Sequence, residues 1–532
     1  MERYVIGVDV GTTATKAVLL DRDLRILAES ASREHATTYP PGHASGAEQD
    51  PDDWWKGCAA AIREVIELAK AAPGDMAAVA VSSQAPCATL LDRDGTPVRP
   101  ALIWMDRRSG GQCRARAAHE PTVRRLTGNA IDPYYAAAKL AWLVEQEPET
   151  RRRTYRVVMA NGYVAFRLTG VHSIDEGHAG LTGLAGTPQV RWERELLELW
   201  GIPPDWMPPI AHPTAVLGGV TAAPASATGL RQGTPVVAGL VDAVAASLEA
   251  GLADAGDVCD MTGQSTVLNA AVPYQVLAKG IGAFTTCAYP IPGLFLLAGT
   301  MVATGGILRW FRDQLGAAAI SSDLPTPALR AAVAEALAHT GDRFSVLDRL
   351  AATAPPGSNG LVLLPYFLGE RSPIWDSDAR GVLFGLSMST TRADVVRAIL
   401  EGTAYGLNHN LEEMRNLGLR FPTLKVVGGG ALGRTWNQIK ADVTGLPVEV
   451  PAEARGATVG SALVAAVGAG ILPSLAVGVR QRYRVGETLP VDPGRHATYQ
   501  GYYGLYRRLY PALVESFREL ARVRQGAAGQ AG

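Results

Sequence analysis

The sequence predicts an α/β protein, and three observations lead to this expectation. Apolar strand segments alternate along the chain with amphipathic helical segments, as in mixed α/β architectures. A strand, a glycine turn and a second strand open the chain at residues 4–20, and the same arrangement recurs at residues 258–268. The chain of 532 residues is also long enough for more than one domain. Because each half opens on the same kind of hairpin, we expect two domains of related architecture.

The boundary between these domains is expected at residues 251–256, after a predicted helix at residues 243–253. This places a first domain at residues 1–253 and a second at residues 254–532. The last residues, from about residue 525, are rich in glycine, alanine and glutamine and predict a frayed tail.

The composition excludes several classes of protein. Hydrophobic residues make up 47% of the chain and charged residues 19%, which is typical of a folded protein with a large core. The 50 basic and 51 acidic side chains leave a net charge of −1, so there is no electrostatic footprint for nucleic acid. The five cysteines lie far apart without C-x-x-C spacing, which favours a reducing compartment over disulfides or zinc. Since no segment has the pattern of a signal peptide or a membrane span, we expect a cytoplasmic protein with no membrane partner.

The first hairpin has the residue types of a phosphate-binding turn. Residues 9–16 read Asp-Val-Gly-Thr-Thr-Ala-Thr-Lys, and Gly11 lets the backbone turn and leaves room for a bulky anion. Successive amides and hydroxyls in such a turn suit phosphate oxygens. The candidate phosphate-binding residues are Gly11, Thr12, Thr13 and Lys16. Asp9 offers a carboxylate for hydrated Mg²⁺, which prefers oxygen ligands. The alternative is an ordinary β-hairpin whose glycine and threonines serve only the turn.

Further elements follow in order along the first half. Residues 54–71 have helical periodicity, with Asp52 or Asp53 as the candidate cap, and residues 77–82 form a short buried strand. Residues 236–240 form another strand that runs directly into Asp242 and a helix. A carboxylate at the carboxyl end of a strand can accept a proton from an attacking hydroxyl. An aspartate at that place also caps helices well, so both interpretations of Asp242 stay open.

A glycine-rich segment follows a strand at residues 424–427 and precedes a helix at residues 435–444. Its glycines 428, 430 and 433 satisfy G-x-G-x-x-G, and Glu449 stands about 20 residues on, as in a dinucleotide-binding fingerprint. A turn that passes under an adenine and ribose explains the segment equally well, and a purely structural turn is the third interpretation.

Two polar groups carry weaker signals. Gln84, Trp104, Asp106 and Arg107 combine an aromatic face with amide, carboxylate and guanidinium groups, which suits a polyol ligand. A buried tryptophan beside a surface ion pair is the alternative. The loop at residues 364–375 is rich in aromatics and prolines, and its Glu370–Arg371 pair is interpreted as structural.

A long pattern in the second half resembles the C-terminal signature of the FGGY carbohydrate kinase family. Residues 381–386 and, seven residues later, residues 394–401 fit that signature at every position compared. Residues 139–146 resemble the N-terminal signature, although Ala136 stands where proline, serine or threonine is usual. The resemblance covers residues 4–475 and implies two RNase H-like domains of the actin-like ATPase fold with a cleft between them.

The resemblance also implies roles for single residues. Asp242 matches the catalytic base, and Asp9 would lie near Mg²⁺ in the first phosphate loop. Gly263 and Ser265 match the second phosphate loop, and Thr304 and Gly305 fall where the family contacts phosphate or ribose. The adenosine-binding segment corresponds to Gly429, Gly430, Ala431 and Asn437. The sugar side corresponds to Gln84, Trp104 and Asp106.

Three further segments of the chain differ from the family pattern. Residues 84–87 read Gln-Ala-Pro-Cys where xylulokinases have Gln-Met-His-Gly, and Ala243 replaces the asparagine after their catalytic aspartate. Gln264 stands in the second phosphate loop where threonine is usual. The first two differences bear on the sugar and not on the phosphoryl transfer.

The expected activity is therefore ATP-dependent phosphorylation of a sugar or polyol hydroxyl, with Mg²⁺ and with a pentulose such as xylulose as the favoured substrate. Another ketose, a tetritol or pentitol, glycerol and gluconate are the alternatives within this class, and the family suggests a homodimer. An NAD-dependent dehydrogenase built on residues 428–433 and a non-catalytic nucleotide-gated sugar sensor are the alternatives of other classes.

Overall fold

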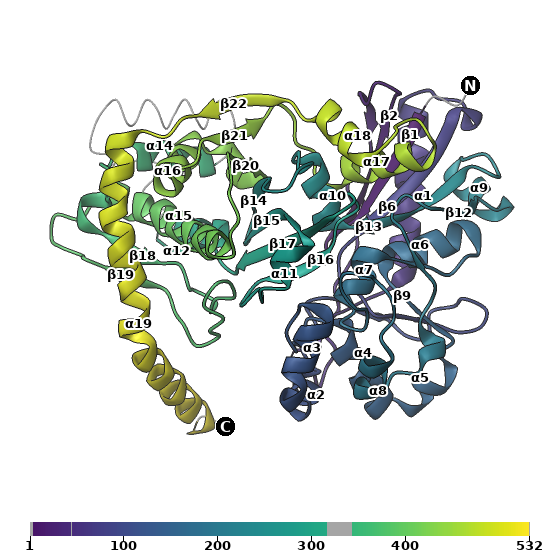
Figure 1. The fold of residues 1–532 in the computed structure, drawn as a ribbon, viewed down its shortest axis with the longest axis horizontal. Helices are drawn as coiled ribbons and strands as arrows, with labels where there is room; N and C mark the ends of the chain where they lie inside the picture. The colour runs from purple at the N-terminus through teal and green to yellow at the C-terminus, as the bar shows by residue number, and fades with distance from the viewer. Residues whose placement is uncertain (1–3, 44, 316–342, 531–532) are drawn as a thin grey trace.

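The computed structural model describes residues 4–43, 45–315 and 343–530 and shows two lobes, each built on a seven-stranded sheet (Figure 1). The two hairpins expected from the sequence provide the first two strands of each sheet. The prediction of two α/β domains is therefore confirmed.

The first sheet has the order β12-β13-β6-β1-β2-β3, with β4 paired to β2. Its strands are β1 (Tyr4–Val10), β2 (Ala14–Leu20), β3 (Ile26–Glu29), β4 (Arg33–Glu34), β6 (Met76–Ser83), β12 (Val216–Gly219) and β13 (Pro235–Val241). β1 pairs antiparallel with β2 and parallel with β6, which in turn pairs parallel with β13. The carboxyl ends of β1, β6 and β13 therefore meet at one edge of the sheet.

The second sheet has the order β16-β17-β15-β14-β20-β21-β22. Its strands are β14 (Val258–Thr262), β15 (Thr266–Pro273), β16 (Thr285–Ala288), β17 (Leu294–Met301), β20 (Leu424–Val427), β21 (Val448–Pro451) and β22 (Val485–Leu489). β14 pairs antiparallel with β15 and parallel with β20, as β1 does with β2 and β6. Each lobe thus has a hairpin strand beside a parallel strand, and the glycine turns occupy equivalent places.

Helices cover the sheets, and small strand pairs extend the first lobe and the α15 region. The helices before residue 250 are α1 (Pro51–Leu68), α2 (Gly110–Ala115), α3 (Glu120–Thr127), α4 (Ala136–Gln146), α5 (Pro148–Arg153), α6 (Ala160–Thr169), α7 (Glu176–Leu181), α8 (Arg194–Trp200), α9 (Ala222–Thr228) and α10 (Asp242–Glu249). Those after it are α11 (Tyr274–Leu277), α12 (Gly305–Gln314), α14 (Arg343–Ala352), α15 (Arg392–Asn416), α16 (Arg434–Thr444), α17 (Ala457–Gly468), α18 (Leu475–Arg482) and α19 (Pro493–Gln530). The small pairs are β5 (Glu48–Gln49) with β8 (Ala101–Leu102), β7 (Thr89–Leu91) with β9 (Arg156–Val158), β10 (Ile174–Asp175) with β11 (Ile210–Ala211), and β18 (Val362–Leu364) with β19 (Val382–Phe384).

Several boundaries differ from the sequence expectations: the helices expected at residues 54–71 and 243–253 are α1 and α10, which end at Leu68 and Glu249. The cap of α1 is Asp50, whose side chain accepts from the backbone N–H of Asp52, so the prediction that Asp52 or Asp53 caps this helix is wrong. Pro51 fits the first helical position because its missing N–H has no partner there anyway. α19 runs to Gln530, through the segment for which the sequence predicts a frayed tail. Among the described residues, no helix combines the length and apolarity that crossing a membrane requires.

The two lobes share a core through α10 and α17, which pack against each other (Figure 1). α17 comes late in the chain, yet it packs on the first sheet. The contact is so close that a Cβ at Gly7 of β1 would stand 2.0 Å from the carbonyl oxygen of Thr458. A Cβ at Gly460 of α17 would likewise stand 1.9 Å from the carbonyl oxygen of Ala245 in α10. Glycine permits both close approaches, and they fix the helix that begins at Asp242.

Candidate active site

A pocket of about 420 Å³ lies between the lobes and gathers groups from both halves of the chain. Its polar lining includes Asp9, Trp104, Tyr134 and Asp242 from the first half and Ser265 and Arg371 from the second. The sequence predicted four of these six as site residues.

Asp9 and Asp242 reach this pocket from adjacent strand ends. Asp9 lies near the end of β1 and pairs with Ser82 of β6, whose hydroxyl donates to Asp9 Oδ1 at 2.7 Å. Asp242 follows β13, on the other side of β6, and is the first residue of α10. The helix cap is Val241, and the backbone N–H of Ala243 donates to Asp242 Oδ1 at 2.6 Å. One carboxylate oxygen is thus held by the helix, and among the described groups Oδ2 has no hydrogen-bond donor.

The environment of this pair disfavours two negative charges. Burial raises the pKa of Asp9 above its ordinary value, and the neighbouring Asp242 raises it further. Burial likewise raises the pKa of Asp242, and the hydrogen bond from the Ala243 N–H and the charge of His178 offset part of this rise. Two carboxylates held close in a buried site attract a proton or a hard cation, so the donor set at Asp9 fits Mg²⁺.

A buried network supports the strand ends from the other face of β6. His178 Nδ1 lies 2.5 Å from Asp175 Oδ2, and His178 Nε2 lies 3.2 Å from the Ser83 hydroxyl. A serine, histidine and aspartate in this order resemble a nucleophilic triad. All three side chains are buried, at 0–1% exposure, so no substrate reaches them. The network is therefore structural, and no periodic pattern or motif in the sequence indicates it.

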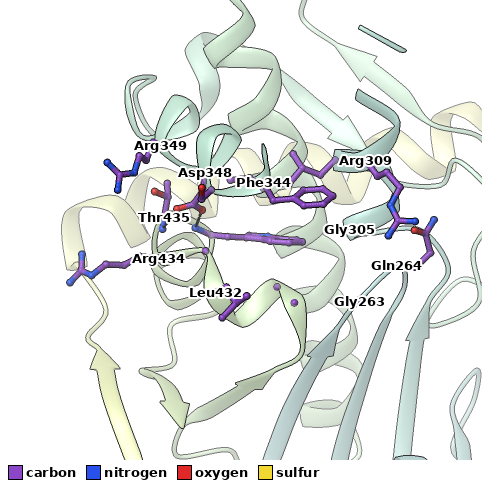
Figure 2. Close-up of a pocket in the computed structure, with 17 residues that line it drawn as sticks. Gly263, Gln264, Gly305, Arg309, Phe344, Asp348, Arg349, Leu432, Arg434 and Thr435 are labelled. Carbon is purple, nitrogen blue, oxygen red and sulfur yellow. Dashed lines mark hydrogen bonds between the residues drawn. The ribbon is translucent and has the colours of Figure 1, made fainter. Parts of the chain in front are cut away.

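A second pocket, of about 640 Å³, lies in the second lobe between the glycine-rich segment and helices α12 and α14 (Figure 2). The Phe344 ring and the Leu432 side chain lie on opposite sides of it. Gln264 and Arg309 lie at the end next to Gly263 and Gly305, and Arg434 lies toward the other end. The slot suits a nucleotide with its phosphates at the end near Gly263 and Gly305, because the hairpin turn and the start of α12 offer backbone groups there beside Arg309.

Close backbone approaches explain the glycines of this pocket. A Cβ at Gly305 would stand 2.2 Å from the carbonyl oxygen of Gly263, and a Cβ at Gly430 would stand 2.5 Å from Thr262 Cγ2. Gly428 adopts a left-handed φ of +83° at the start of the turn. Side chains at these positions would push the glycine-rich turn and α12 away from the second hairpin.

The second hairpin turn lies where the two pockets meet. Gly263 lines the nucleotide-sized pocket, and Ser265, two residues later, lines the interdomain pocket. The turn is fixed to α12, because the backbone N–H groups of Thr304 and Gly306 both donate to the carbonyl of Gln264. A chain of phosphates can therefore run from one pocket over this turn toward Asp242.

Other predicted site residues lie beside the pockets without lining them. These are Gly11, Thr13, Lys16, Thr304, Ala431 and Asn437. Lys16 is exposed and pairs across the hairpin with Asp9, and Thr304 is buried, with its Oγ1 accepting from Thr266. Asn437 donates to the carbonyl of Ala431 at 2.7 Å and so fixes the glycine-rich turn.

The structure does not bring two predicted sugar-binding residues into the interdomain pocket. Asp106 is fully buried, and its carboxylate accepts from the Ala47 N–H and from Arg108. Gln84 donates to Gln49, which donates in turn to the carbonyl of Thr12. Gln84 thus braces the first hairpin and Asp106 braces the segment at Ala47, and their contact with the sugar stays a prediction. Trp104 does line the pocket and donates to Thr12 Oγ1 at 2.9 Å.

Sequence reasoning missed several lining residues. Tyr134 and Arg371 line the interdomain pocket, and Gln264, Phe344 and Trp436 line the nucleotide-sized one. Trp436 stands three residues after Gly433, in the first turn of α16, so the glycine-rich segment was the available signal for it. Tyr134 and Arg371 lie in separate irregular segments, so no local pattern connects them.

Comparisons with known proteins agree with this arrangement. The model of the FGGY family of carbohydrate kinases, N-terminal domain, matches residues 4–248, and that of its C-terminal domain matches residues 262–469. A glycerol kinase of Rhodospirillum rubrum is 31% identical, covering 95% of this chain and 99% of the relative. The chain belongs to the FGGY family of carbohydrate kinases. A xylulose kinase of Staphylococcus epidermidis is 26% identical, with 98% of this chain and 99% of the relative covered. The crystal structure of a xylulose kinase from Rhodospirillum rubrum matches with a TM-score of 0.84 and 32% identity, covering 97% of this chain and 100% of that one.

The protein is thus an ATP-dependent carbohydrate kinase of the FGGY family. The interpretation of residues 428–433 as the fingerprint of a dehydrogenase is wrong, and so is that of a non-catalytic sensor. Glu449, the expected ribose-binding acid of a dehydrogenase, instead accepts from the Tyr483 hydroxyl at 3.2 Å. The G-x-G-x-x-G spacing arises here because the turn packs closely on β14, which needs glycine for a reason unrelated to NAD.

Proposed function

We propose that this FGGY kinase transfers the γ-phosphoryl group of ATP to a hydroxyl of a small sugar or polyol in the interdomain pocket, with Asp242 as the base. The observation that carries the proposal is the place of Asp242, which lines the same pocket as Ser265 of the second phosphate loop. Its free Oδ2 can accept the hydroxyl proton as the phosphoryl group arrives.

The remaining residues have supporting roles in this proposal. Phosphate binding is assigned to Gly11, Thr12, Thr13, Lys16, Gly263, Ser265, Thr304 and Gly305. Adenosine binding is assigned to Gly429, Gly430, Ala431 and Asn437. Trp104 offers a flat apolar face to the sugar, while Gln84 and Asp106 position the segments around it. Asp9 would hold Mg²⁺ through water, and the ion would neutralise charge on the phosphates.

The choice of sugar depends on the first-half wall of the pocket. Ala85, Leu181 and Ala243 line it and offer no polar side-chain atoms. Orientation of the hydroxyls therefore depends on Asp242, on Tyr134 and on the polar groups of the second lobe. A pentulose such as xylulose is the favoured substrate, because xylulose kinases are among the relatives that match over nearly the whole chain.

An ADP-release screen tests the function and the substrate together. Ketopentoses, ketohexoses, tetritols, pentitols, glycerol and gluconate are each supplied with ATP and Mg²⁺. We expect stimulation of ADP release by a ketopentose, with the highest kcat/KM in the panel. A different best substrate would reject the pentulose assignment alone, whereas ADP release that no member stimulates would count against the proposed function.

The raised pKa of Asp242 predicts an unusual acid limb in the pH profile. A base works only when it is deprotonated, so kcat/KM should fall about tenfold per pH unit below its pKa. Because burial raises that pKa, the fall should begin well above the usual aspartate value of about 3.9. Initial rates across pH 4–9 measure this, with tryptophan fluorescence as the control for folding. A profile that stays flat down to about pH 4 would contradict it.

A further inference from the structure

Glu370 and Arg371 are neighbours in the chain but do not form an ion pair with each other. The Glu370 carboxylate is buried, and its Oε1 accepts from the backbone N–H groups of Val302 and Arg371 at 2.8 and 2.9 Å. Burial raises the pKa of Glu370 to about 8, which favours its neutral form. Glu370 therefore anchors the loop to the end of β17, and the Arg371 side chain is left for the pocket.

The Arg371 guanidinium lines the interdomain pocket and faces the other lobe. It lies over the Tyr134 ring, 5.6 Å from its centroid, and Tyr134 in turn donates to the carbonyl of Ala85 at 3.0 Å. Lys139 donates to the carbonyl of Tyr134 at 2.5 Å, which fixes that segment. Within the described residues, the guanidinium has no hydrogen-bond or ion-pair partner of its own. A cation–π contact orients this group but leaves its five N–H donors unused.

The charged side chains that line the interdomain pocket indicate what Arg371 binds. The charged side chains that line it are Asp9, Asp242 and Arg371, so Arg371 supplies its only cation among the described residues. This half-buried guanidinium keeps N–H donors that the oxygen atoms of a ligand in the pocket can engage. Its planar fork suits two oxygens of one anionic group, as in a phosphoryl or carboxylate group.

The backbone connects Arg371 to the second phosphate loop. The N–H of Ser372 donates to the carbonyl of Thr300 at 3.0 Å, and Thr300 of β17 pairs with Val267 of β15. Val267 and Ser265 line the same pocket, two residues apart. The loop with Arg371 is thus fixed to the hairpin over which the phosphates are expected to pass.

We propose that Arg371 binds an anionic oxygen group of a reactant in the interdomain pocket, and that this group is the phosphoryl group during transfer. The inference rests on the proposed function. In the step, the γ-phosphorus bonds to the substrate oxygen as its bond to the β-phosphate oxygen breaks. That electron pair leaves with ADP, and the hydroxyl proton goes to Asp242. Arg371 forms no covalent bond and offsets the charge on the equatorial oxygens. A carboxylate on an acidic acceptor is the other source of the same chemistry.

The test compares Arg371→Gln, which keeps a planar polar group without charge, with Arg371→Lys, which keeps a point charge without the fork. Arg380→Ala is the matched control, because Arg380 lies in the same segment, outside both pockets, and donates to the carbonyls of Ser377 and Ala379. We expect kcat to fall by about 100-fold in Arg371→Gln and less in Arg371→Lys, as for loss of one charge-stabilising donor. The KM for a neutral acceptor and the ATP affinity should stay within about threefold, since ground-state binding does not depend on this contact.

The outcomes are distinguishable. A loss confined to gluconate as the acceptor, and seen as a higher KM, identifies the anion as a substrate carboxylate and overturns the phosphoryl assignment. Wild-type kcat and KM in both Arg371 variants, or a fall matched by a lower unfolding temperature in both, overturns the inference altogether. If the wild-type protein shows no sugar-dependent ADP release, the proposed function fails and this inference fails with it. An active wild type with unaffected variants rejects the role of Arg371 alone.

Discussion

Replacement of Asp242 by asparagine is expected to lower sugar-dependent ADP release by about 10²–10⁴-fold, the usual contribution of a general base. Asparagine has nearly the same shape, and its side-chain oxygen can still accept the Ala243 N–H that holds Oδ1 in the wild type. Helix α10 should therefore keep its place. The variant loses only the group that takes the proton from the substrate hydroxyl.

The nucleotide should still bind to this variant. Asp242 does not line the pocket formed by α12, α14 and the glycine-rich turn, so ATP affinity measured by calorimetry should change by less than about threefold. Asp254→Asn is the matched control, because Asp254 is exposed, outside both pockets, and pairs with Arg480 at the surface. Turnover near the wild-type level in Asp242→Asn would reject its role as the base.

The elements around Asp242 could be predicted because their signals are local. The strand before Asp242 and the helix after it follow from hydrophobic periodicity, and both hairpins follow from a glycine turn between apolar segments. The residues that end such strands at one edge of a sheet must lie near each other, which brings Asp9 and Asp242 together. Residue types at these positions were therefore sufficient to place the two carboxylates.

The direction of side chains in irregular segments could not be predicted. Asp106 follows Trp104 by two residues, yet Trp104 lines the pocket while Asp106 is enclosed by Arg108 and the Ala47 N–H. Glu370 and Arg371 point to different places for the same reason. Outside helices and strands no fixed period relates neighbouring side chains, so long-range contacts decide which of them meets the ligand.

The packing of α17 on the first sheet could not be predicted either, because the sequence of this helix is apolar and rich in small residues throughout. No local sequence pattern indicates that Gly460 of α17 packs against the carbonyl of Ala245 in α10. This contact leads to the second large effect, which concerns stability and activity together.

Replacement of Gly460 by alanine is expected to destabilise the protein and to reduce activity. The new Cβ would stand 1.9 Å from the carbonyl oxygen of Ala245 and 2.5 Å from its carbon, and backbone atoms cannot rotate away. Overpacking of this kind costs about 1–3 kcal/mol or more, which exceeds the gain of about 1 kcal/mol in helix propensity from glycine to alanine. α10 must therefore shift away from α17, and Asp242 at its start shifts with it.

Thermal unfolding and kcat measure the two consequences. Gly501→Ala in α19 is the matched control: among the described residues, no atom beyond the neighbouring helix backbone lies within 4 Å of its would-be Cβ, and the variant should be more stable by about 0.4–1 kcal/mol. If the unfolding temperature falls in Gly460→Ala and rises in Gly501→Ala, the steric contact is distinguished from the effect of helix propensity. If Gly460→Ala instead kept the wild-type unfolding temperature and kcat, the helices could separate without cost. The base would then be positioned by β13 alone, and the contact between α10 and α17 would have no part in holding the site.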